Sequence, residues 1–107
     1  MTNESAGMEI ARTIIAQMGG QGRLKAMIGA TNFVSTNKGV MFSFKGSKIA
    51  NKVDISLTPL DLYDVKFYKI NMKNLEKSII PVDEIEGVYN DMLIEIFEKT
   101  TKLYLYF

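Results

Sequence analysis

The chain has 107 residues, with 13 Lys or Arg against 12 Asp or Glu and a formal net charge of +1 at pH 7. It has no cysteine, which excludes disulfides and thiol chemistry, and no histidine, which removes the commonest general base and metal ligand. With 47% hydrophobic and 23% charged residues, the composition favours one globular domain over residues 1–107, for which we expect no cofactor.

The sequence contains no apolar run as long as a membrane span. Its first stretch, "MTNESAGMEIART", lacks the basic region and the apolar region of a secretory signal. We therefore expect a cytoplasmic protein that makes no contact with a membrane.

The charges are divided unevenly along the chain. From Arg23 to Lys52 there are six bases and no acid, and from Asp83 to Glu98 there are six acids and no base. Such an asymmetry is typical of a surface that binds a polyanion, but it also fits two solvated faces that partly neutralise each other.

The first predicted element is a helix from Ser5 to Met18, with the Ser5 hydroxyl as its N-cap. Its apolar residues recur at helical spacing, as Met8, Ala11, Ile14, Ile15 and Met18. The following stretch, "GGQGRLK", has the glycines of a phosphate loop, but it lacks Gly-Lys-Ser or Gly-Lys-Thr and has Lys25 in place of a third glycine. We interpret it as a helix cap that leads into a strand.

The next segments alternate between apolar and polar residues, which predicts strands. The expected strands are "RLKAMIGATNFV" at 23–34, as one strand or two short ones, "VMFSFK" at 40–45, "NKVDISLT" at 51–58 and "LYDVKFYKI" at 62–70, with a further strand at 75–80. Short turns join them, which favours an antiparallel meander.

A final helix is expected to start at Asp83, because Asp83 and Glu86 have capping-box spacing. Its apolar stripe comprises Ile85, Val88, Tyr89, Met92, Leu93, Ile96 and Phe97. Ile94 is expected to point away from that stripe, and "LYLYF" at 103–107 is interpreted as a terminal strand.

These elements predict an α+β fold with an N-terminal helix, an antiparallel meander sheet of four or five strands, and a C-terminal amphipathic helix packed on one face of the sheet. Matching periodicities select the expected core: Ile15, Leu24, Ile28, Phe42, Phe44, Val53, Ile55, Leu57, Val65, Phe67, Val88, Met92, Leu93 and Ile96.

Catalytic groups are scarce in this sequence. Asp61 and Asp64 in "DLYD" form the one tempting carboxylate pair, but no third ligand follows at a recognisable spacing, and Asp61 fits a turn after Pro59. We therefore expect no metal site and no enzymatic activity.

The outward positions of the predicted sheet carry several bases. They suggest a nucleic-acid surface, with charge along the backbone and a ring to stack on bases, made of Arg23, Lys25, Lys45, Lys48, Lys52, Lys66 and Tyr68. Asp54 and Asp64 interrupt this face, so an ordinary solvated sheet face remains the alternative.

Three stretches, "AMIGATNFV", "DLYDVKF" and "GVYNDMLIEIFEKTTKLYL", resemble a family of small proteins of bacteriophages and mobile elements. The resemblance runs from about Met18 to the C-terminus and rests on Ile28-Gly29-Ala30, the Asp61–Asp64 box and Gly87-Val88-Tyr89. That family has no assigned activity, so the resemblance implies no catalytic residue. One departure is Lys102, which stands where a glycine is expected to end the helix.

Two functions follow as expectations. The first is a non-enzymatic protein that binds an unidentified host protein, in the host cytoplasm if a phage encodes it. The alternative is a nucleic-acid-binding module that uses the basic segment Arg23–Lys52. A homodimer is also expected, through the terminal strand or the outer face of the last helix, with Ile94, Tyr104 and Tyr106 at its interface.

Overall fold

The structure, a computed structural model, describes residues 3–73 and 76–105. The elements are the helices α1 (Asn3–Gln17) and α2 (Gln21–Ile28), the strands β1 (Thr31–Ser35), β2 (Gly39–Ser43), β3 (Lys52–Leu57), β4 (Tyr63–Lys73) and β5 (Glu76–Val88), the 3-10 helix η1 (Asn90–Met92) and the helix α3 (Leu93–Thr101). The five strands pair antiparallel in the order β1-β2-β3-β4-β5. This confirms the predicted α+β meander with a helix toward each end.

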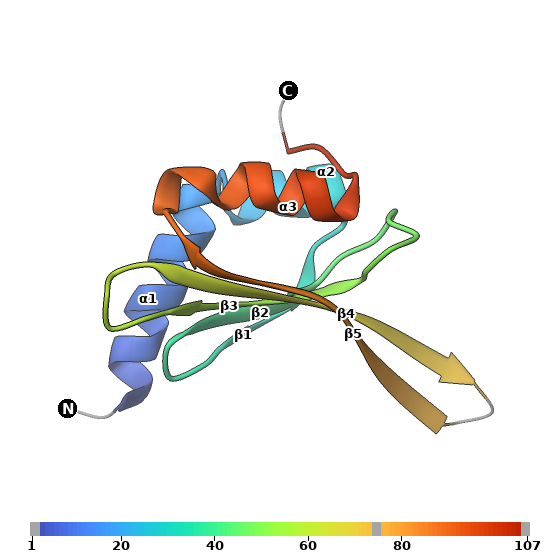
Figure 1. Cartoon of the computed structure of the whole chain (residues 1–107), viewed down its shortest axis with the longest axis horizontal. Coiled ribbons are helices and arrows are strands. Elements are labelled where there is room, and N and C mark those ends of the chain that lie inside the picture. The colour runs from blue at the N-terminus through green and yellow to red at the C-terminus, as the bar shows by residue number, and fades with distance from the viewer. Residues whose placement is uncertain (1–2, 74–75, 106–107) are drawn as a thin grey trace.

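The helices pack against one face of the sheet (Figure 1). The core between the two layers is centred on Phe97 of α3, whose ring lies 5.0 Å from that of Phe44 and 6.0 Å from that of Phe67, between centroids. Helix α1 lies along β1 and β2. Its backbone passes so close to Thr36 at Gly7 that a Cβ at this position would collide with the Thr36 carbonyl. In the described part of the chain, no helix covers the other face.

The segment after the first helix is a second helix, so the strand predicted to begin near Arg23 is wrong up to Ile28, and only its later part is a strand, β1. Leu24 and Ile28 are buried one helical turn apart, whereas Ala26 between them is exposed. Gly29 adopts a left-handed conformation and ends α2, with its N–H donating to the Lys25 carbonyl at 3.1 Å. A spacing of two residues joins Leu24, Ala26 and Ile28, but a spacing of four also joins Leu24 to Ile28, which is why the alternation was misleading.

The predicted start of the last helix at Asp83 is also wrong. Strand β5 continues to Val88, because Asp83 pairs with Phe67 and Ile85 pairs with Val65 across the ladder. Gly87, at a φ of 68°, forms a bulge, which lets β5 turn Val88 into the core. Helix α3 therefore begins ten residues later than expected, and the first helix begins at Asn3 rather than after a cap at Ser5.

Most of the predicted core is buried, with one clear exception. Met92 is 37% exposed because it ends η1 instead of lying inside a long helix. Ile15, Leu57 and Ile96 are partly buried at the margin of the core. The buried hydrophobic residues outside the expected core list are Ala11, Ile14, Met18, Ala30, Val40, Ala50, Tyr63, Phe97 and Leu105. Four of them, Ala11, Ile14, Met18 and Phe97, belong to the apolar stripes predicted for the two helices.

The two features proposed for self-association are not where the sequence placed them. Ile94 is half-buried and packs against the core instead of pointing away from it. Residues 102–105 form no strand; Leu105 is buried, and its N–H donates to the Glu98 carboxylate at 2.7 Å. Tyr104 is exposed, and Tyr106 lies outside the described residues.

Lys102 at the end of α3 is predicted to be a strained position. It adopts a left-handed conformation (φ 64°), with its N–H donating to the Glu98 carbonyl at 2.8 Å. Since a Cβ is unfavourable there, Lys102→Gly should raise the free energy of unfolding by about 1 kcal/mol. Lys99→Gly, inside the same helix, should lower it by a similar amount, about 1 kcal/mol. Urea denaturation measures both, and the same sign for both would contradict this C-cap.

Candidate binding face of the sheet

The face of the sheet opposite the helices carries a band of paired charges. Val53, Ile55, Val65 and Phe67 are buried in the core, so the alternate residues of β3 and β4 point to the other face. Register places Asp54 between Met41 and Lys66, and Lys66 next to Glu84. The Lys66 ammonium lies 3.4 Å from the Glu84 carboxylate.

Strands β4 and β5 extend beyond the rest of the sheet as a two-stranded arm, residues 69–80 (Figure 1). Strand β3 reaches only to the pairing of Lys52 with Tyr68, whereas β4 and β5 stay paired as far as Lys73 and Glu76. The arm exposes apolar side chains, with Met72 67% and Ile79 57% accessible. Two-stranded hairpins are marginally stable alone, and exposed apolar patches mark interaction sites.

Asn51 fastens the base of this arm to the sheet. Its side-chain amide donates to the Ile70 carbonyl at 2.8 Å and accepts from the Ile70 N–H at 2.7 Å, as a backbone partner would. Its own N–H donates to the Tyr68 carbonyl at 2.9 Å, and its carbonyl accepts from the Phe44 N–H at 2.9 Å. The Asn51 side chain therefore replaces the pair of backbone hydrogen bonds that β3, which begins at Lys52, does not make to Ile70.

An open groove of about 680 Å³ lies between the arm and the β1–β2 side of the same face. Its described lining residues are Thr31, Asn32, Val34, Met41, Ser43, Phe44, Lys45, Asn51, Lys52, Ile70, Met72 and Lys77. A smaller hollow of about 270 Å³ shares Met41, Lys52 and Ile70 with it and adds Asp54, Tyr68 and Ile79. The two hollows therefore adjoin each other on the helix-free face.

Edge strand β1 contributes an irregular wall to this groove. Thr31 pairs with Ser43 and Val34 pairs with Met41, so β1 carries one extra residue over this interval. Asn32 takes up the bulge with a φ of 56°, a conformation that Asn tolerates better than most residues. The bulge brings Asn32 and Val34 to the groove.

The pKa values of two ionisable groups in the band of paired charges, Asp54 and Lys66, are raised. Partial burial raises the pKa of the Asp54 carboxyl above its ordinary value of 3.8, and the nearby Lys66 ammonium only partly offsets that effect. A hydrogen bond to Glu84 and the charge of Glu84 raise the pKa of Lys66, which stays fully charged at neutral pH.

Asp54→Asn should stabilise the protein more at neutral pH than in acid. Because the pKa of Asp54 is raised by folding, the unfolded chain ionises first, and the free energy of unfolding falls as the pH rises from 3.8 through the folded-state value. The Asp54→Asn variant has no carboxyl at this position, so this fall in the free energy of unfolding is absent from it. Urea denaturation of both proteins, below 3.8 and at neutral pH, should show the variant gaining on the wild type as the pH rises. A constant difference, or one of opposite sign, would contradict the raised pKa; Asp91→Asn on exposed η1 is the control.

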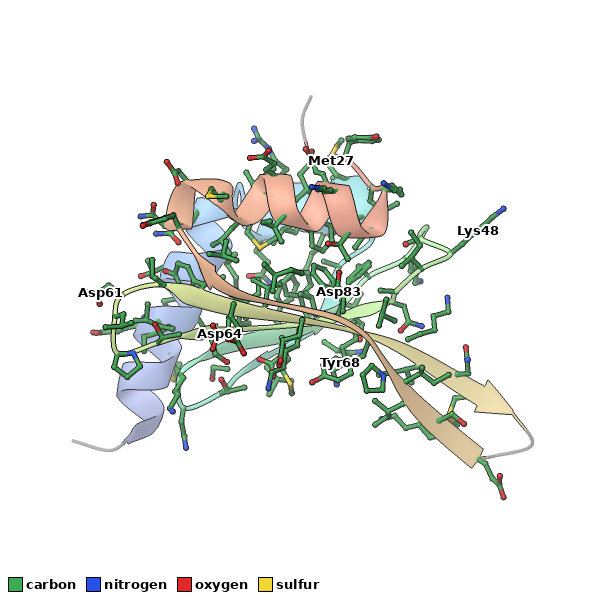
Figure 2. The ribbon with its side chains drawn as sticks, in the orientation of Figure 1. Met27, Lys48, Asp61, Asp64, Tyr68 and Asp83 are labelled. Carbon is green, nitrogen blue, oxygen red and sulfur yellow. The ribbon has the colours of Figure 1, made fainter. Side chains whose placement is uncertain are left out.

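The residues predicted for nucleic-acid binding are dispersed by the fold. Arg23 and Lys25 belong to α2, whose Leu24 and Ile28 join the core, so Lys25 does not share a sheet face with the others as predicted. Lys48 lies on the loop between β2 and β3 (Figure 2) and is not among the residues that line the groove.

Four of the predicted residues remain together on the helix-free side. Lys45 and Lys52 line the groove, and Lys66 and Tyr68 follow on β4. Tyr68 lies on the side of the sheet away from the helices (Figure 2). The sequence interpretation missed the apolar lining residues Val34, Met41, Ile70 and Met72. Two of them could have been predicted, because Ile70 and Met72 lie two and four residues after outward-pointing Tyr68 and alternate residues of a strand share a face.

The two aspartates of "DLYD" have separate structural roles. Asp61 has a φ of 59° in the β3–β4 turn, and its N–H donates to the Thr58 carbonyl at 3.1 Å, as expected of a turn residue. Asp64 accepts from the Gly87 N–H at 3.3 Å, which supports the β5 bulge. Over residues 3–73 and 76–105, no three acidic side chains gather as a metal-binding group would.

Comparison of the chain with protein-family models, with curated proteins and with solved structures finds no match. Among the helices of the described residues, none is long and apolar enough to cross a membrane. The candidate site therefore rests on the geometry of this chain alone.

Proposed function

We propose that this chain is a non-enzymatic binding protein that docks a protein of the host cell, in the host cytoplasm, on the helix-free face of its sheet. The observation that carries the proposal is the groove of about 680 Å³ bordered by an arm with exposed apolar side chains. Surfaces of this kind, apolar inside and polar at the rim, are typical of protein–protein contacts. The absence of histidine and cysteine from the sequence also supports a role without catalysis.

Affinity capture from host lysate tests the proposal with matched variants. The double variant Met72→Glu/Ile79→Glu places charges on the exposed arm, and Leu60→Glu places one on the exposed β3–β4 turn instead. We expect one captured protein to bind wild type and Leu60→Glu in calorimetry and to lose binding to the double variant. Equal binding to the double variant, or no specific capture by the wild type, would contradict the proposal.

Nucleic-acid binding is the second candidate, supported by Lys45, Lys52 and Lys77 around the groove and by Tyr68 beside it. Such binding would weaken steeply with salt, because lysine–phosphate contacts release counterions. Titration of labelled single- and double-stranded DNA and RNA at low and moderate salt tests it. Binding that falls steeply with salt and is lost on substituting these three lysines would favour the second candidate over the first.

A further inference from the structure

We infer that the groove takes a short segment of a protein partner in which apolar side chains are flanked by acidic residues. This inference rests on the proposed function and adds the chemistry of the partner. Three properties of the groove support this chemistry: its apolar interior, the sign of its charges and the blocked edges of the neighbouring strands.

The interior of the groove is apolar and adaptable. Val34 from β1, Met41 from β2 and Ile70 and Met72 from β4 line it. Val34 is half-exposed and Met72 about two-thirds exposed, so an apolar partner side chain would remove their surface from water. The two methionines can adjust their unbranched side chains to an incoming group. An apolar partner segment fits this interior.

The charges around the groove have one sign. Lys45, Lys52 and Lys77 approach it from the β2–β3 loop, from β3 and from β5, and its described lining contains no carboxylate. Asp54 in the adjoining hollow is countered by Lys66 and Lys52. Charges at a rim favour complementary partners and speed association, so acidic residues are expected beside the apolar ones.

Edge strands β1 and β5 are poor templates for an added strand, and where β4 extends past β3 the Asn51 side chain already occupies the Ile70 N–H and carbonyl. Edge strand β5 contains Pro81, which has no N–H to donate, and edge strand β1 is short and bulged at Asn32. Both features are devices that block pairing at an edge. The partner segment is therefore expected to lie across the face, in the groove, instead of extending the sheet.

Selection from a random peptide library displayed on phage, with the immobilised protein as bait, tests this chemistry. We expect enriched peptides with apolar residues flanked by Asp or Glu. Their affinity should fall about tenfold or more for the triple variant Lys45→Gln/Lys52→Gln/Lys77→Gln. The control Lys25→Gln/Lys48→Gln removes two exposed lysines that do not line the groove and should bind as wild type does.

The other outcomes separate this inference from the proposed function. Enriched peptides without acidic residues, which bind the triple variant normally but fail on Met72→Glu, would overturn the inferred chemistry and keep the docking groove. Peptides indifferent to both sets of variants, or no enrichment, would overturn both. Analytical ultracentrifugation of the bait protein tests whether a second copy of the chain occupies the groove. A wild-type dimer that Met72→Glu converts to a monomer would overturn the inference. Tighter binding of DNA or RNA than of any peptide would also overturn it.

Discussion

Phe97→Ala is expected to lower the free energy of unfolding by about 3–5 kcal/mol, the largest effect of any substitution considered. Phe97 is 1% exposed, and its ring meets those of Phe42, Phe44 and Phe67 at centroid distances of 6.5, 5.0 and 6.0 Å. These three rings come from the sheet side, so Phe97 packs α3 directly against the sheet. Truncation would leave a cavity that the surrounding rings cannot fill.

Met92→Ala is the matched control for Phe97→Ala. A helix starting at Asp83 would bury Met92, but the structure leaves it exposed at the end of η1. We therefore expect a loss below about 1 kcal/mol for this variant. Urea or thermal denaturation of both variants gives the comparison. If Met92→Ala and Phe97→Ala lowered the free energy of unfolding by similar amounts, Met92 would be buried. The helix would then begin before Leu93 and bury a different face.

Asn51→Ala should release the base of the arm. The variant leaves the Ile70 N–H and carbonyl without their amide partner, which costs about 1–3 kcal/mol for partly buried groups. Amide hydrogen exchange at Ile70 should therefore accelerate, and peptides selected for the groove should bind more weakly. Asn51→Asp should be nearly as harmful, because a carboxylate can accept from the Ile70 N–H but cannot donate to its carbonyl.

Asn71→Ala, at an exposed position within the arm, is the control for Asn51. It should change neither the exchange at Ile70 nor the global stability by more than about 0.5 kcal/mol. If the Ile70 amide hydrogen exchanged at the wild-type rate in Asn51→Ala, the Asn51 side chain would not be what holds the arm to the sheet. Other contacts would then keep the arm, and the groove beside it, in place.

The sheet could be predicted from the sequence because its strands alternate cleanly and short turns join them. Phe42, Val53, Ile55, Val65 and Phe67 are buried as their parity required. Helix α2 was missed because Leu24 and Ile28 fit both the strand period and the helix period, and only tertiary burial, which leaves Ala26 exposed, decides between them. The start of α3 was placed too early because the Asp83–Glu86 spacing imitates a cap within a segment that pairs with β4.

The candidate site could be predicted only in part. Outward-pointing Lys52, Lys66 and Tyr68 follow from strand parity. The groove does not, because it depends on how far β4 and β5 extend past β3 and on the bulge at Asn32, neither of which has a local signature. The bidentate role of Asn51 likewise depends on a residue 19 positions away in the chain.

Photocrosslinking inside host cells tests the docking groove most directly. Benzoylphenylalanine replaces Met72, which lines the groove, or Leu60, which is 80% exposed on the β3–β4 turn. We predict one protein adduct from position 72, joined through a segment with apolar and acidic residues, and none of that protein from position 60. Adducts of the same protein from position 60 alone, or no protein adduct from position 72, would contradict the groove as the docking surface.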